Sequence, residues 1–287
     1  MMAPSSPVVA RWDLGRRLRE QREMLGLTGA AAGRPVALSA TFLSDVENGK
    51  KNLPDDKLDA LIASLEFDGD AAAELRRLRA EGGQRGWWSK FNALFSAELL
   101  RFFGYEHGAE SIHVFGSSVV PGLLQTRDYA RAVIETGSPW IRLAEADLRV
   151  EARMLRQRRL TADEPLRLTT VLSEAALRQQ IGGPEVLVAQ LRHLATMIEE
   201  HPDTLEVLVV PFSSPGYPAL GGNYHLLTFP SPTLPPLVWL ENITSTELVY
   251  DAIRLKEYGL AHTGAIGASL NKQDTLRLIE QVAKETS

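Results

Sequence analysis

The segment Thr28–Gly49, TGAAAGRPVALSATFLSDVENG, decides the fold of the N-terminal region. Thr28 is a suitable N-cap for a short helix, which Pro35 limits to about two turns. Ser39 can cap a further helix, and Asn48-Gly49 is a typical C-terminal stop. The apolar residues of this further helix are Phe42, Leu43 and Val46. Two short helices joined by a tight turn predict a helix-turn-helix.

Further helices are expected on both sides of this segment. Leucines recur at near-helical spacing over 13–25, and Gly26 follows them as a stop. A fourth helix is expected to start at Pro54, and a fifth to cover 70–80. These segments together predict an all-α helix-turn-helix domain over 11–80. Residues 1–10 lack the features of a signal peptide and are expected to form a short disordered tail.

The same region carries a family resemblance. The residues that carry it are Leu14-Gly15, Leu18-Arg19, Arg22, Gly26-Leu27-Thr28, Ser39, Leu43-Ser44 and Val46-Glu47-Asn48-Gly49-Lys50. This pattern resembles the Xre-type, or lambda-repressor-like, helix-turn-helix. The resemblance implies that the helix after Ser39 enters the major groove and that dimers read paired half-sites. It also implies a structural ion pair between Arg22 and Glu47.

Mapped residue by residue, the resemblance gives a set of DNA-binding candidates. The groove-facing residues are Ala40, Thr41, Ser44 and Asp45, and the residues near phosphates are Ser39, Asn48, Lys50 and Lys51. Thr28 is a further DNA-binding candidate. Ala40 offers only a methyl contact to thymine, and Asp45 repels phosphate. Gly29, Gly33 and Pro35 weaken the first helix of the pair. DNA affinity is therefore expected to depend on dimerisation, on an arm residue such as Arg11 or on a partner, and a helical interaction domain that has lost DNA binding is the alternative.

The distribution of charge agrees with a local nucleic-acid surface. The net charge of −5, from 31 basic and 36 acidic residues, argues against a protein that coats nucleic acid with its whole surface. Residues 1–80 hold 12 basic and 12 acidic side chains, whereas 81–287 hold 19 and 24. Within 11–53 there are 8 basic and 5 acidic residues, so the basic surplus is confined to the N-terminal region.

Composition excludes several kinds of chemistry. The chain has no cysteine, so disulfides, thiol catalysis and cysteine metal sites are ruled out. Its six histidines have no metal-ligand spacing, and no nucleophile or phosphate-loop motif occurs. Residues 207–240 contain no Lys, Arg, Asp or Glu, but prolines and glycines interrupt them, so no membrane helix is expected there. We therefore expect a cytoplasmic protein that is not an enzyme and uses no cofactor.

The larger C-terminal part is expected to be an α+β domain over 87–287. Residues 81–86 include three glycines and are a candidate hinge. The expected strands cover 166–172, 205–211, 224–229 and 236–241, and helices over 248–258 and 272–283 end the chain. An aromatic run extends from Trp87-Trp88 to Phe103. This run is interpreted as a helix packed in the core, with a ligand-lining or dimer surface as the alternative.

Several motifs of this part are distinctive in combination. They are Val120–Thr126 (VPGLLQT), Arg153 with Arg156-Gln157, Glu174–Leu177 (EAAL), Gln190-Leu191 with Leu194, and Val207–Phe212 (VLVVPF). Together they resemble the uncharacterised C-terminal domain that is joined to Xre-type heads in actinobacterial WhiJ-like and antitoxin-like regulators. The resemblance implies a transcriptional regulator, often encoded beside a small acidic partner protein, and no defined enzymatic activity.

Arginines on the predicted helix around 149–159 are ambiguous. Arg149, Arg153 and Arg156 lie near one face, where guanidinium groups could hold an anion, or could pair internally with Glu174, which is the favoured interpretation. The candidate partner or ligand site comprises Trp87, Trp88, Gln125, Arg153, Arg156 and Glu174.

Three hypotheses follow for the whole chain. The first is a homodimeric regulator of a double-stranded DNA operator, in which a partner protein or a small-molecule effector bound to the C-terminal domain changes the spacing or freedom of the heads. The second is an antitoxin-like interaction protein that sequesters a small acidic partner and has little DNA specificity. The third, an enzyme in the C-terminal domain, lacks every motif that could support it.

Overall fold

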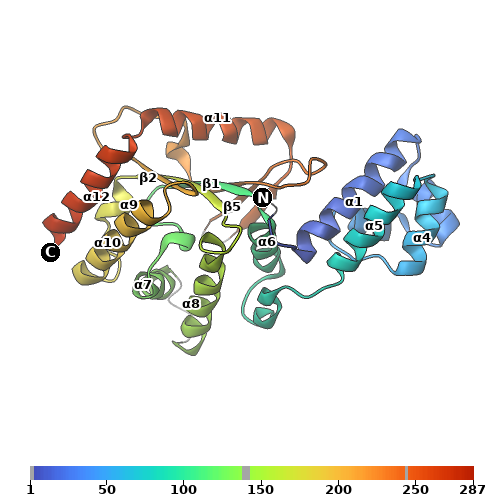
Figure 1. The fold of residues 1–287 in the computed structure, drawn as a ribbon, viewed down its shortest axis with the longest axis horizontal. Helices are drawn as coiled ribbons and strands as arrows, with labels where there is room; N and C mark the ends of the chain where they lie inside the picture. The colour runs from blue at the N-terminus through green and yellow to red at the C-terminus, as the bar shows by residue number, and fades with distance from the viewer. Residues whose placement is uncertain (1–2, 138–142, 243–244) are drawn as a thin grey trace.

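The computed structural model describes residues 3–137, 143–242 and 245–287. A bundle of short helices at the N-terminus is followed by a six-stranded sheet with helices on both faces (Figure 1). We call residues 7–82 the head and residues 87–287 the body. The predicted fold class, an all-α head followed by an α+β domain, is confirmed.

The helices of the head are α1 (Pro7–Met24), α2 (Gly29–Gly33), the 3-10 turn η1 (Arg34–Val36), α3 (Ala40–Glu47), α4 (Asp55–Ser64) and α5 (Gly69–Gly82). Side-chain caps begin four of these helices, namely α1, α2, α3 and α5. Thr28 and Ser39 cap α2 and α3 through their hydroxyls, as the sequence predicts. Gly26 and Gly49 follow α1 and α3 with positive φ angles of 66° and 64°, a conformation that glycine adopts without strain.

The first helix starts earlier than the sequence predicts. α1 begins at Pro7, so the expected disordered tail over 1–10 is wrong from that residue onward. The Ser6 hydroxyl accepts a hydrogen bond from the Val9 amide and donates one of 2.6 Å to the carbonyl of Gly104 in the body. Valines have only modest helix propensity, so tertiary packing against the body accounts for this extra turn.

Two glycines on α6 (Ala97–Gly108) bring α1 against the body. A Cβ atom on Gly104 would lie 2.3 Å from Cγ2 of Val8, and one on Gly108 would lie 2.7 Å from Cβ of Ser6. Both distances are too short for real atoms, so only glycine permits this approach. Glycines four residues apart lie on the same face of a helix, which makes Gly104 and Gly108 a single contact surface.

Trp12 continues this contact one turn along α1. Its ring meets those of Tyr105, Phe229 and Tyr250 edge to face, with centroids 5.3 to 5.6 Å apart. Trp12 and Val8 belong to the main core of the body, whereas Leu14 and Leu18 of the same helix belong to the core of the head. α1 therefore takes part in both hydrophobic cores.

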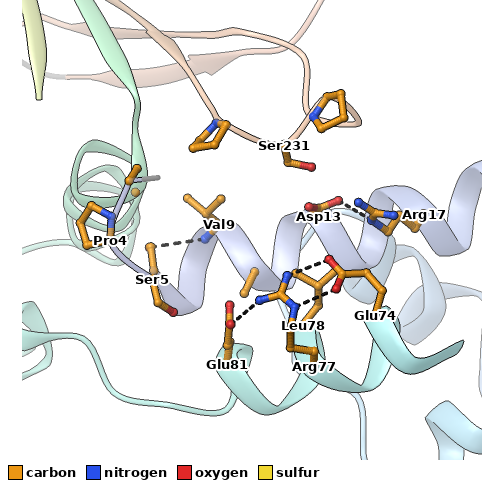
Figure 2. Close-up of a pocket in the computed structure, with 16 residues that line it drawn as sticks. Pro4, Ser5, Val9, Asp13, Arg17, Glu74, Arg77, Leu78, Glu81 and Ser231 are labelled. Carbon is orange, nitrogen blue, oxygen red and sulfur yellow. Dashed lines mark hydrogen bonds and ion pairs between the residues drawn. The ribbon is translucent and has the colours of Figure 1, made fainter. Parts of the chain in front are cut away.

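Polar contacts flank the shared helix (Figure 2). Asp13 accepts a hydrogen bond from Thr233, which lies just beyond Ser231 on the loop drawn above α1, and another from Arg17. On the other side, Arg77 of α5 is held by Glu74 and Glu81. A groove of about 350 Å³ runs between α1, α5 and this loop. The expected hinge over 81–86 overlaps the last turn of α5, and its role as a hinge stays a prediction.

The sheet of the body is mixed, with two parallel and three antiparallel strand pairs. Its strands are β1 (Ser111–Gly116), β2 (Arg167–Ser173), β3 (Leu205–Val210), β4 (Tyr224–Thr228), β5 (Leu237–Glu241) and β6 (Thr246–Val249). They are arranged in the order β3-β2-β1-β4-β5-β6, and only the pairs β1–β2 and β2–β3 are parallel. The four expected strands are confirmed. β1 was not predicted, and β6 replaces the start of the helix expected over 248–258.

Helices cover both faces of the sheet. One face carries α6, α7 (Arg127–Gly137), α8 (Leu143–Gln157), α9 (Ala175–Arg178), α10 (Pro184–Glu200) and α12 (Lys272–Thr286), and the other carries α11 (Ala252–Ala268) (Figure 1). Short 3-10 turns complete the body: η2 (Trp87–Phe91), η3 (Gly122–Leu124), η4 (Arg158–Leu160) and η5 (Pro218–Gly221). Within the described ranges, no helix is both long and apolar enough to cross a membrane.

The contact between α1 and α6 predicts unequal effects for two glycine substitutions. Gly104→Ala should lower the free energy of unfolding by about 1–3 kcal/mol, because the added methyl group overlaps Val8. Gly259→Ala in α11 is the matched control, since its added methyl group meets no atom within 4 Å. Urea titration of the two variants measures the difference. Equal stability of the two variants would show that α1 does not depend on this close approach.

A buried histidine predicts that stability falls at low pH. His262 of α11 contacts the Tyr224 hydroxyl through Nδ1 at 3.3 Å and faces the ring of His113 at 5.0 Å. Burial, with a smaller effect of His113, lowers the pKa of His262 to about 4. The unfolded chain therefore binds an extra proton between about pH 6.5 and pH 4, so stability declines as the pH falls through this window. His262→Gln should have a shallower decline in urea titrations at pH 4.5 and 7, and an unchanged slope would contradict this assignment.

Candidate nucleic-acid interface

The exposed face of α3 gathers the residues expected to face the groove. Ala40, Thr41 and Ser44 are exposed, whereas Leu43 and Val46 on the opposite side are buried in the core of the head. α3 follows α2 after a short turn, which is the arrangement in which the second helix enters the major groove. The face offers the methyl groups of Ala40 and Thr41 and the hydroxyls of Thr41 and Ser44, and none of these three side chains can bind a base in bidentate fashion.

The C-terminal end of α3 combines both signs of charge. Lys50 and Lys51 are exposed, and Nζ of Lys51 lies 2.8 Å from Oδ2 of Asp45. The Lys51 ammonium lowers the pKa of Asp45, so that carboxylate stays ionised at neutral pH. Asn48 uses its side-chain amide to cap the helix, donating to the carbonyl of Ser44 at 2.7 Å. Lys50 is therefore the less compensated of the two lysines.

Arg34 is a candidate phosphate contact that was not predicted. It is exposed in η1, between α2 and α3, and no ion pair of Arg34 occurs in the part of the chain that the structure describes. A signal was present in the sequence, since Arg34 is the only Arg or Lys between Arg22 and Lys50. Thr28 and Ser39, on either side of it, are exposed and use their hydroxyls as helix caps.

Arg22 and Glu47 join α1 to the end of α3. Nε and Nη2 of Arg22 donate to the two carboxylate oxygens of Glu47 at 2.6 and 2.9 Å, and Nη1 donates to the carbonyl of Leu27 at 2.7 Å. The side chains are only 11% and 7% exposed, and the hydrogen bond to Glu47 raises the pKa of Arg22. This pair, implied by the family resemblance, fixes α3 and the loop before α2 to the same helix.

Arg11 is not part of a flexible arm. It lies in the second turn of α1, where Nη1 donates a hydrogen bond of 2.6 Å to the carbonyl of Gly82 at the end of α5. The expectation that Arg11 is an arm residue is therefore wrong, because the helix starts before it.

The body contacts the end of the candidate reading helix directly. Nη2 of Arg101 in α6 donates to the carbonyl of Asn48 at 2.6 Å, and its Nε donates to the Tyr105 hydroxyl at 3.1 Å. Gly49 packs against α1 so closely that a Cβ atom there would lie 2.8 Å from Cα of Trp12. The position of α3 is thus set by the body as well as by the head.

The residues expected to form one partner or ligand site do not all meet. Trp87 and Trp88 pack edge to face on each other, and Trp87 also stacks on Phe103. The aromatic run forms η2 and α6 with a break between them, so the single helix expected there is wrong. Glu174 lies elsewhere, where it accepts hydrogen bonds from Arg178 and from the Phe212 amide.

The arginines of α8 have a different partner from the one expected. Arg156 donates to both carboxylate oxygens of Glu106, at 2.6 and 2.7 Å, so the favoured pairing with Glu174 is wrong. Arg153 donates to Oε1 of Gln125 at 2.7 Å, which brings Gln125, Arg153 and Arg156 together. Glu106 lies in α6, in a run of aromatic residues that gave no sequence signal for an ion pair.

Histidines and carboxylates do not gather into a metal site. Within residues 3–137, 143–242 and 245–287, no group of three His, Asp or Glu side chains could hold a metal ion.

Comparison with known families divides the chain at the same place as the structure. A model described as "Helix-turn-helix domain" matches residues 13–75. A model described as "Domain of unknown function (DUF5753)" matches residues 99–281, which is more than half of the chain. Searches of curated proteins and of solved structures found no match.

The ion pair between α1 and α3 predicts the stability of the head. Glu47→Gln should lower the free energy of unfolding by about 3 kcal/mol, because it leaves the nearly buried Arg22 without a counter-charge. Glu20→Gln removes an exposed pair with Arg16 and should cost about 0.5 kcal/mol or less. Circular dichroism during urea unfolding compares the two variants. A loss for Glu47→Gln no larger than for Glu20→Gln would contradict the structural role of the pair.

Proposed function

Because the chain belongs to the family defined by the domain of unknown function DUF5753 and carries a helix-turn-helix domain before it, we propose that it is a transcriptional regulator of the Xre type. It acts on double-stranded operator DNA in the cytoplasm and catalyses no reaction. The relatives we propose for it are the actinobacterial WhiJ-like and antitoxin-like regulators. The observation that carries the proposal is the exposed face of α3, bordered by the three cations Arg34, Lys50 and Lys51.

The composition of this face suggests how DNA is recognised. Ala40 supplies a methyl contact for thymine, and the hydroxyls of Thr41 and Ser44 can bond to either base type. The three cations contact phosphates and contribute affinity without sequence information. Since a single head with these readers discriminates weakly, we propose a homodimer on paired half-sites, in which two heads add their preferences.

Contacts between head and body support a regulatory role for the body. Arg101 holds the carbonyl of Asn48, and Trp12 lies in the core of the body. A partner protein or small-molecule effector that shifts α6 would therefore reorient α3 relative to the second head. This mechanism changes the geometry of the heads, and so the occupancy of half-sites at a fixed spacing.

A second candidate function is supported by one observation. Asp45 places an ionised carboxylate beside the reading face and compensates Lys51, which weakens attraction to phosphate. An antitoxin-like protein that sequesters a small acidic partner, with little DNA specificity, would have this property.

Electrophoretic shift assays at several salt concentrations test the DNA-binding surface. Arg34→Ala should weaken binding to all sequences alike and reduce the slope of log K against log salt by about one. Arg277→Ala is the control, because this exposed residue lies on α12 of the body.

In the same assay, Asp45→Asn should strengthen DNA binding, because it removes the repulsion between the Asp45 carboxylate and phosphate.

The same assay separates the two candidate functions. Fragments from the gene's own promoter should be preferred over shuffled fragments of equal length by the wild-type protein. If the folded protein shows no preference at low salt, the regulator proposal fails and the sequestering role becomes the better explanation.

A further inference from the structure

A cavity of about 290 Å³ opens in the body at one end of the central strands of the sheet. β1 and β5 finish at this end and β4 begins there, because β4 is antiparallel to both of its neighbours. The wall includes Val114–Gly116 from the end of β1, Val119–Gly122 from the following turn, and Glu241 from the end of β5. Between β1 and β4 the strand order β3-β2-β1-β4-β5-β6 changes direction, and ligand sites of open α/β sheets lie outside the carboxyl ends of strands at such a point.

Arg153 extends from α8 into the wall of this cavity. Its Nη1 donates to Oε1 of Gln125 at 2.7 Å, and no carboxylate of the described residues lies within 4 Å of its guanidinium. Burial lowers the pKa of Arg153 to about 10, and the nearby charge of Arg156 adds to this effect. Arg153 is half-buried, and a guanidinium in such a place with only a neutral amide as partner is a cation that lacks compensation.

Neighbouring charges do not remove this excess. Arg156, one turn further along α8, is already paired with Glu106, whose side chain is only 2% exposed. Arg149 donates to the carbonyl of Leu94 at 3.1 Å and lies over the ring of Phe95. Glu241, exposed at the rim, is the one carboxylate besides Glu106 that attracts Arg153, and it is outside ion-pair distance. The local balance is therefore positive.

The remaining wall is mostly apolar. Leu99, Phe102 and Val133 form part of it, and the ring of His225 of β4 packs edge to face on Phe102. Burial lowers the pKa of His225 to about 4, so its imidazole is neutral at pH 7 and offers a hydrogen bond without a charge. A second cavity of about 270 Å³ shares Arg153 and Arg156 and continues toward Arg149.

We propose that this cavity binds a small organic anion, whose carboxylate or phosphate is held by Arg153 and whose apolar part packs on Leu99, Phe102 and Val133. Guanidinium groups bind both kinds of anion in bidentate fashion, and the anion would supply the charge that Arg153 lacks. The cavity volume is at the small end of the range for ligand sites. The assignment of this anion as an effector rests on the proposed function as a regulator.

α6 links this cavity to the head. Phe102 forms part of the cavity wall, and Arg101, the next residue toward the N-terminus, bonds to the carbonyl of Asn48. Glu106 on the same helix holds Arg156, and Gly104 receives α1. An anion that draws Arg153 and Arg156 together would act on α6 through the pair of Arg156 with Glu106. α6 in turn contacts the end of α3.

Calorimetry on the full-length protein tests the site with defined probes. Benzoate and phenyl phosphate carry the two candidate anions, while benzamide and benzyl alcohol have similar shapes without charge. At least one anion should bind below 10 mM, and at least tenfold more tightly than the uncharged probes. Comparison of benzoate with phenyl phosphate identifies the preferred anion. Arg153→Met should weaken this binding at least tenfold, whereas Arg277→Met, on the exposed face of α12, should not change it.

A second measurement keeps the test decisive if Arg153→Met does not fold. Crystals of the wild-type protein soaked in 4-bromobenzoate should show an anomalous bromine peak in the cavity, with the carboxylate at Arg153. The proposal is overturned if neither anion binds at 10 mM, if an uncharged probe binds as tightly as the tighter-binding anion, or if bromine lies elsewhere. Shift assays without any probe report on DNA binding separately. Anion binding without DNA preference would remove the regulator proposal and leave the site intact.

Discussion

The fold depends on the packing of α1 against α6. Gly104 and Gly108 remove the side chains that would separate the two helices, and Trp12 then enters an aromatic cluster of the body. The other half of α1 carries Leu14 and Leu18 into the head. One continuous helix therefore fixes the position of one core relative to the other, because a helix bends less easily than a loop. The packing of α1 in the body consequently determines the orientation of the head.

The arginines of the protein interior have two kinds of partner. Arg22 and Arg156 are each paired with a carboxylate in bidentate geometry, and both pairs tie together helices that are distant in sequence. Arg153 lies one turn from Arg156, yet its partner is a neutral amide. The ion pairs of Arg22 and Arg156 specify how helices pack. A cation without a counter-charge in a cavity instead lowers stability, and such a cation is typical of a binding site.

Local signals allowed much of the head to be predicted. The hydroxyl caps at Thr28 and Ser39 and the leucine periodicity act within a few residues, so they are visible in the sequence. The start of α1 was missed because its first turn is stabilised by Gly104, almost a hundred residues away. The glycine spacing of α6 was the available signal for that contact. β1 was missed because SIHVFG is short and includes a histidine and a glycine within an apolar pattern.

Long-range pairing also explains which parts of the candidate site were found. Gln125, Arg153 and Arg156 were singled out by motif and meet in space, but the partner of Arg156 depends on how α6 crosses α8.

The contacts of Trp12 with residues far along the chain have a consequence for synthesis of the protein. Two of its aromatic neighbours, Phe229 and Tyr250, emerge from the ribosome more than 200 residues after it. The first helix to be made is thus among the last to complete its packing, so a prematurely terminated chain could carry every candidate DNA-binding residue and still lack the support that orients them.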